Sequence, residues 1–330
     1  MQDKNFVISF KSILIFLLTV FLIWVFWLIR DIVLFLFVSL ILALALEPFV
    51  DFLVAKKIHR GFSVVFVVFS LLIIIAGLAS VSLAPFIQQS QVLITNFPNY
   101  MKSLSEIPGA GDYINKFNDG ILAGLNQTGG SVINFTLGAF SGVLSLILIF
   151  VFTIYMLLDF KNLRLMFVDL FEDERRDEIQ KLVTKIETRL GSWLRGQILL
   201  MLIIGVLTYI GLLIIGMDYA LPLAVIAGLL EVVPIVGPII SLVPAALIGF
   251  FISPVVGVGV VILYLFVQQL ENSLIVPKVM QKAVGFNPLI TIIALMVGGQ
   301  LLGVVGAILA IPILITFYEV FMYVIKDKVS

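Results

Sequence analysis

The stretch Glu231-Val-Val-Pro-Ile-Val-Gly-Pro-Ile-Ile-Ser-Leu-Val-Pro244 sets a carboxylate and a Pro-x-x-Gly-Pro break between two wholly apolar runs. Pro234 and Pro238 cannot continue a helix, and Gly237 permits backbone angles that a helix does not need. The pattern predicts two half-helices, residues 220–230 and 239–252, joined by an unwound tip in mid-membrane.

An unwound tip leaves backbone groups free. The first half-helix ends on carbonyls with Glu231 beside them, and the second begins with bare amides, so the tip carries both partial charges of its helix ends. Such a site suits an ion or a polar solute, because a buried carboxylate must be paired, protonated or bound to an ion. The alternative is that Glu231 only makes structural hydrogen bonds at the tip.

Composition defines the broad class. Hydrophobic residues make up 62% of the 330 residues and charged residues 12%, with a mean hydropathy of +1.22. Soluble domains carry about 25% charged residues, so we expect an all-α polytopic protein embedded in a lipid bilayer. A net charge of zero argues against a nucleic-acid partner. The absence of cysteine excludes disulfides and thiolate metal sites.

The N-terminal region predicts three spans. Residues 12–29 and 32–46 form the first two, with a minimal turn at Arg30-Asp31, and residues 62–86 form the third. The loop before the third span holds Lys56, Lys57 and Arg60, so positive-inside counting places this loop and the N-terminus in the cytoplasm. Residues 87–131 then predict short amphipathic helices on the outer membrane surface.

The middle of the chain alternates a span with a charged helix. Residues 132–158 return across the membrane, and residues 159–195 predict a cytoplasmic amphipathic helix with a solvated charged face. Residues 197–216 cross outward again. We therefore divide the chain into an N-terminal region of 1–131, a span with its cytoplasmic helix at 132–196, and a transport core at 197–330.

Two topologies fit the transport core. If residues 220–252 form a re-entrant hairpin, Lys278 and Lys282 lie in the cytoplasm; if they form one interrupted span, the two lysines lie outside. Positive-inside bias favours the hairpin. The last apolar run, 289–325, is about twice the length of a span and predicts a second hairpin. Its candidate break residues are Gly298, Gly299, Gln300, Gly303 and Gly306. With these two segments we expect about eight membrane segments in all.

The two hairpins show weak internal symmetry. Pro222-Leu223 corresponds to Pro288-Leu289 and Gly237 to Gly303 at one offset, which aligns Gln300 with Pro234. Hairpins that enter from opposite faces form the inverted pair on which alternating-access transporters are built.

Polar residues also gather between the hairpins. Four polar side chains at the end of an apolar run are costly unless they face protein or water. They are Gln268, Gln269, Glu271 and Asn272. Residues 268, 271 and 272 share a helical face and are candidates for lining one cavity. The alternative is a set of interfacial residues that cap a span.

These motifs resemble the autoinducer-2 exporter family of permeases. The resemblance lies in Glu231-x-x-Pro-x-Val-Gly-Pro, Gln269-Leu-Glu-Asn followed by Pro277-x-Val-Met, Gly285-x-Asn-Pro-Leu, and the glycine-rich segment 298–312. It implies a multi-pass homo-oligomer in the cell membrane. The family includes exporters of autoinducer-2 and sodium or lithium exchangers for protons.

The resemblance carries over at motif positions only. It marks Glu231, Pro234, Gly237 and Pro238 at the first break, then Gln269, Glu271, Asn272 and the hinge Pro277. Asn287 stands where many relatives have histidine, and the only histidine, His59, lies in a basic loop. Any proton coupling must therefore use carboxylates.

Other function classes lack their motifs. The sequence has no His-Glu-x-x-His, no Gly-x-Ser-x-Gly and no nucleotide-binding loop, which argues against an enzyme, a cofactor and a primary pump. A scaffold does not need two helix breaks and a carboxylate at membrane depth. We expect a secondary exporter of a small polar solute, coupled to H⁺ or Na⁺, with cytoplasmic termini. A sodium(lithium)/proton antiporter is the alternative.

Overall fold

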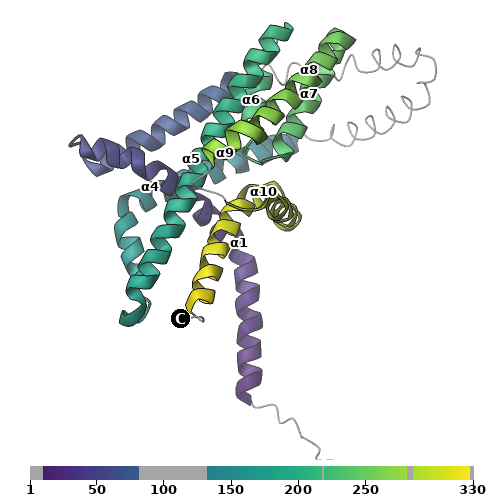
Figure 1. Ribbon diagram of the computed structural model, residues 1–330. Helices are drawn as coiled ribbons and strands as arrows, with labels where there is room; N and C mark the ends of the chain where they lie inside the picture. The colour runs from purple at the N-terminus through teal and green to yellow at the C-terminus, as the bar shows by residue number, and fades with distance from the viewer. Residues whose placement is uncertain (1–9, 82–131, 218, 281–284, 328–330) are drawn as a thin grey trace, which may run out of the picture.

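The computed structural model describes residues 10–81, 132–217, 219–280 and 285–327. Throughout these ranges the regular structure is helical (Figure 1). Six of the described helices are long and apolar enough to cross a membrane, and shorter apolar helices accompany them. The predicted class of an all-α polytopic membrane protein is confirmed. The leader and the amphipathic helices predicted within 87–131 lie outside the described residues.

The first element, α1 (Phe10–Ala55), is one helix of 46 residues. The turn predicted at Arg30-Asp31 is therefore wrong. Arg30 and Asp31 pair on the surface at 3.6 Å, and the Arg30 guanidinium lies over the Trp27 ring at 4.3 Å. No proline or glycine interrupts the helix there, so these two charges are carried on its exposed side. A second helix, Arg60–Val81, follows.

The next helices reproduce the predicted change from span to charged segment. In α4 (Val132–Val168) the backbone leaves helical geometry at Asp159, where the charged segment was predicted to begin. After the short 3-10 turn η1 (Asp173–Arg175), α5 (Arg176–Ile215) runs through the charged segment and the following span as one helix of 40 residues. It ends at Gly216, whose φ of 86° is left-handed.

The predicted break lies between α6 (Ala220–Leu230) and α7 (Val236–Ile252). The first half-helix has the predicted bounds, whereas the second begins three residues before the predicted 239. Gly237 lies inside α7, and the left-handed φ of 70° belongs to Ile235. Glycine is required at 237 for another reason: a Cβ there would overlap the Leu230 carbonyl, so the two half-helices touch through backbone atoms.

Backbone contacts fix the direction of each helix. Gly228 of α6 lies against Met201 of α5, and Ala224 lies against Gly205, so these two helices are antiparallel. Gly249 of α7 faces Gly257 of α8 (Pro254–Leu270), which makes this pair antiparallel as well. Gly211 of α5 lies against Leu263 of α8, and Ile215 of α5 lies near Gly259, so α8 is antiparallel to α5 as well. The segment α6–α7 is therefore a hairpin, not one interrupted span.

Helix α8 continues into a π-helical turn, η2 (Glu271–Ile275), and then α9 (Val276–Val279). No pattern in the sequence predicted this turn. It widens the helix at the polar side chains of residues 268–272. Single π-turns inside α-helices recur at functional sites.

The last helix, α10 (Pro288–Asp327), is broken at Gly303, where φ is 63° and ψ is −144°. Its two limbs run in different directions (Figure 1), and their backbones touch at Gly298 and Gly306. Phe286, just before α10, stacks edge-on against Tyr318 near its far end, with ring centroids 5.4 Å apart. The segment therefore begins and ends side by side, as predicted for a second hairpin.

The two hairpins enter the bundle from opposite ends and meet inside it. The first hairpin begins and ends at the end of the bundle where Gly216 and Ser253 lie. The second begins and ends at the opposite end, where α10 contacts the charged half of α5. Val233 at the first tip packs with Leu295 and Ala310, which lie on both limbs of α10. This is the geometry of an inverted pair.

Candidate functional site

The tip of the first hairpin is a short non-helical segment between Glu231 and Ile235. Val232 and Val233 donate their backbone amides to Leu229 and Leu230, so the α6 end is closed by tight turns. Pro234 is half-buried within the tip. The Pro238 carbonyl accepts a hydrogen bond from the Ser241 hydroxyl at 3.1 Å.

Glu231 is fully buried, with 0% of its surface exposed. Neither carboxyl oxygen receives a hydrogen bond from a donor in the described residues. The carboxyl group lies within hydrogen-bonding reach of the Glu271 carboxyl, an arrangement that becomes a bond only when one of the two carries a proton. Two adjacent buried carboxyl groups cannot both be charged without a proton or cation between them.

Glu271 reaches the tip because α7 and α8 are antiparallel. The register that places Gly249 opposite Gly257 and Ser241 beside Tyr264 also places the start of η2 opposite the tip. Glu271 is 4% exposed and accepts a hydrogen bond from the Gln268 amide at 3.1 Å. The structure thus joins Glu231 to Gln268 and Glu271, which the sequence analysis placed in two separate motifs.

Gln197 on α5 completes this group and was not predicted as a site residue. It is fully buried and donates a hydrogen bond of 2.6 Å from Nε2 to the Glu231 backbone carbonyl. A carbonyl can only accept, so this contact fixes the amide orientation and leaves Gln197 Oε1 without a donor in the described chain. Its sequence signals were a polar residue at the start of an apolar run and its place in the motif Trp193-Leu-Arg-Gly-Gln197, which also resembles the autoinducer-2 exporter family.

Other predicted residues lie apart from this group. Gln269 is exposed and donates to Ser273 at 3.0 Å, while Asn272, Pro277 and Gln300 are also exposed. The shared helical face expected for residues 268, 271 and 272 is not kept, because η2 turns Asn272 outward. The tip group is therefore narrower than the predicted list.

The glycines of the second hairpin have separate structural roles. Gly298 allows the two limbs of α10 to touch, Gly303 supplies the backbone conformation of the break, and an added Cβ at Gly299 would meet only Ala307 at 4.0 Å. The positive φ angles of the two breaks fall on Ile235 and Gly303. If Ile235 is aligned with Gly303, the alignment of the two hairpins differs by two residues from the predicted one, in which Gly237 corresponded to Gly303. In the new alignment Pro244 corresponds to Pro312.

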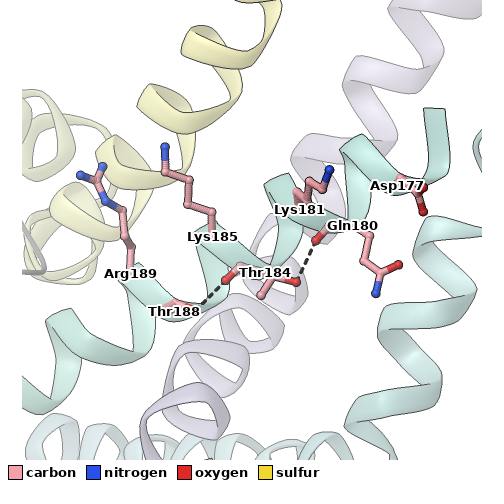
Figure 2. Close-up of a pocket in the computed structure, with 7 residues that line it drawn as sticks. All are labelled: Asp177, Gln180, Lys181, Thr184, Lys185, Thr188 and Arg189. Atoms are coloured by element: carbon pink, nitrogen blue, oxygen red, sulfur yellow. Dashed lines mark hydrogen bonds between the residues drawn. The ribbon is translucent and has the colours of Figure 1, made fainter.

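A second polar region is an open groove on the charged half of α5. Figure 2 shows its lining. The lining residues are Asp177, Gln180, Lys181, Thr184, Lys185, Thr188 and Arg189. At its edge Lys185 and Arg189 reach α10 and pair with Glu319, at 2.8 Å and 2.5 Å. Glu319 is 2% exposed and was not predicted as a functional residue.

The described residues contain no group of three or more histidine or acidic side chains that suits a metal ion. The two carboxyl groups at the tip instead offer oxygen atoms to a proton, a monovalent cation or a hydroxylated solute.

Two hairpins that enter from opposite ends, with a buried carboxyl pair at one tip, form an arrangement that recurs in secondary transporters of the membrane. Residues 14–326 match the model of the AI-2E family transporters, and the chain belongs to this family. The resemblance noted in the sequence is confirmed over nearly the whole chain.

Two similar proteins cover most of the chain, and a third covers less than half of it. The Bacillus subtilis protein YueF, assigned to transport by its name, is 28% identical over 294 residues, 83% of this chain and 79% of its own. The Escherichia coli K12 protein YhhT, named in the same way, is 26% identical over 296 residues, 86% and 82% of the two chains. A sodium-lithium/proton antiporter of Halobacillus andaensis is 28% identical over 147 residues, 44% and 42% of the two chains.

Proposed function

We propose that this protein is an ion-coupled secondary transporter of the cell membrane that exports a small polar solute of the autoinducer-2 kind. One observation carries the proposal: the carboxyl groups of Glu231 and Glu271 share a buried site at a helix break, between hairpins that enter from opposite ends. Helix breaks that place carboxylates between inverted hairpins are typical of coupling sites.

The proposed mechanism uses the carboxyl pair as the coupling group. Occupation by a proton or Na⁺ neutralises one negative charge and lets the tip close in a dry environment. When the hairpins move and the site opens to the other face, water solvates the pair and the ion leaves. The solute binds next to the same tip, so its passage depends on that exchange.

Sodium(lithium)/proton antiport is the second candidate, and the acceptor atoms at the tip favour it. Glu231 supplies two oxygens and Gln197 one that receive no donor in the described residues. Each unsatisfied buried acceptor costs about 1–3 kcal/mol. A small cation satisfies several oxygens at once, and the relative from Halobacillus bears the name of such an antiporter.

The test is proton flux in proteoliposomes that contain a pH-sensitive dye. Na⁺ or Li⁺ is added to one side, and the wild type is compared with Glu231→Gln. A cation-driven pH change that falls at least about tenfold in the variant supports antiport through the carboxyl pair, since removal of an ionisable coupling group abolishes exchange. The matched control is Glu174→Gln, the same change at an exposed carboxylate of η1 away from the tip, and it is expected to transport normally.

If the wild type shows no cation-driven pH change, solute export is tested next. Vesicles loaded with candidate polar solutes, autoinducer-2 among them, are then followed for efflux driven by a pH or Na⁺ gradient. Efflux that Glu231→Gln abolishes supports the first candidate. Coupled flux that survives in Glu231→Gln contradicts both, because the tip then has no part in coupling.

A further inference from the structure

Helix α5 contacts both hairpins through polar side chains, and in each contact the group on the hairpin is buried. Gln197 donates to the backbone carbonyl of Glu231 at the tip of the first hairpin. Lys185 and Arg189 bind Glu319 on the second limb of α10. Figure 2 shows both cations extending from α5 on the side of α10. The two contacts lie on the same helix but act on different hairpins.

The helix between the two contacts is continuous and well packed. Arg189 and Gln197 are eight residues apart, about 12 Å along an α-helix, and α5 shows no break there, unlike α4 and α10. Leu190, Trp193 and Leu200 form one core cluster with Leu309, Ile311 and Ile315 of α10. A displacement of α5 at one contact is therefore transmitted to the other.

The Glu319 contact is suited to opening and closing. The carboxyl group is 2% exposed, whereas the side chains of Lys185 and Arg189 are 59% and 28% exposed. Arg189 also lies 5.7 Å from the Tyr318 ring, which stacks on Phe286. The ion pairs thus lie at the end of the second hairpin where Phe286 packs against Tyr318, and water has access to the cations that would be released.

We propose that α5 couples the two hairpins, with Gln197 and Glu319 as positioning residues, and that the Glu319 ion pairs open in each transport cycle. Breaking them loosens the far end of α10 from the charged half of α5, while the apolar cluster between the two helices stays in contact. Helix α5 then shifts the Glu231 tip through Gln197. The inference rests on the proposed transport function, but it predicts a structural coupling that can be measured without knowing the solute.

The first experiment cross-links the contact. The protein has no cysteine, so Lys185→Cys and Glu319→Cys can be combined and joined by a short bis-methanethiosulfonate reagent, which bridges side-chain distances that a direct disulfide does not. Transport is expected to stop on cross-linking and to return on reduction, while each single variant treated with the reagent keeps its own untreated rate. Undiminished transport by fully cross-linked protein overturns the proposal.

The second experiment measures coupling directly and does not depend on transport. Ile235, 40% exposed at the tip, is replaced by cysteine, and its rate of maleimide labelling is measured in purified protein. Glu319→Gln is expected to change this rate by about fivefold or more, the lower range of allosteric coupling. Asp177→Asn, an exposed carboxylate on the same helix, is the control and is expected to leave the rate unchanged.

A double variant tests whether the effect passes through Gln197. In a Gln197→Met background the labelling rate is expected to be insensitive to Glu319→Gln, because the contact that transmits the shift is gone. An unchanged rate in Glu319→Gln alone, with the protein monodisperse and helical, overturns the coupling. If labelling responds as expected but neither cations nor solutes are transported, the coupling stands and the proposed function fails.

Discussion

At the tip of the first hairpin, the backbone and the side chain of Glu231 have separate roles. Glu231 caps α6 with its backbone and shares a buried site with Glu271 through its side chain. Its carbonyl is stabilised by Gln197, while its carboxyl oxygens stay without donors in the described chain. The backbone of the tip is thereby fixed, while the carboxyl group of Glu231 keeps two acceptor oxygens for the ion exchange that we propose.

Gly237 sets how closely the half-helices approach. We expect Gly237→Ala to lower stability by about 1–3 kcal/mol, as overpacking does, because the new Cβ overlaps the Leu230 carbonyl. Thermal unfolding of purified protein in detergent measures the effect. Gly259→Ala is the control, since a Cβ there meets only Ile215 at 3.8 Å. Equal unfolding temperatures for the two variants would contradict the backbone contact.

Some of these functional candidates could be predicted from the sequence, and others could not. Glu231 and Glu271 stand out because carboxylates inside apolar runs are rare and costly. Gln197 and Glu319 were missed because their partners are 34 and 130 residues away in the chain. No periodicity or local motif relates such distant positions, so only the helix arrangement brings them together.

Among the elements, the broken helix α10 depends on one backbone conformation. Gly303 has φ 63° and ψ −144°, a region open to glycine alone, and an added Cβ would have no described atom within 4 Å. The cost of Gly303→Ala is therefore conformational, about 1–3 kcal/mol. We expect transport to fall with stability in this variant. Gly299→Ala, four residues earlier, should retain both in the same flux and unfolding assays; a loss as large as at Gly303 would contradict this reading of the break.

Prolines and glycines correctly predicted the helix breaks of the two hairpins, whereas the charged pair Arg30-Asp31 wrongly predicted a turn. The end of α6 at Leu230 follows from the prolines of the tip, and the bend of α10 from its glycines. By contrast, Arg30 and Asp31 continue α1, because exposed charges on a helix can pair along its surface. The left-handed angle at Ile235 was assigned to Gly237, since sequence reasoning favours glycine wherever φ is positive.

Across the whole molecule, basic residues gather at one end of the bundle. Arg60 donates to the Leu157 carbonyl, Arg164 pairs with Glu187, and Arg195 donates to the Leu44 carbonyl. Met280 lies against Gly196, which places the end of α9 at the same level. These contacts join the loop after α1, the bend of α4, the middle of α5 and α9 in one layer. Positive-inside bias predicts that this layer faces the cytoplasm.

The position of this layer predicts on which side of the membrane Lys278 lies, a question that counting the basic residues of the loops left open. Cysteines placed at Lys56 and Lys278 should both resist a membrane-impermeant maleimide in intact cells, whereas a cysteine at Tyr219, beside the start of the first hairpin, should react. Permeabilised cells provide the control, where all three sites should label. Because α6–α7 is a hairpin, it leaves α8 to return to the basic end. Opposite accessibility at Lys56 and Lys278 would require one interrupted span, and the inverted arrangement of the two hairpins would then be wrong.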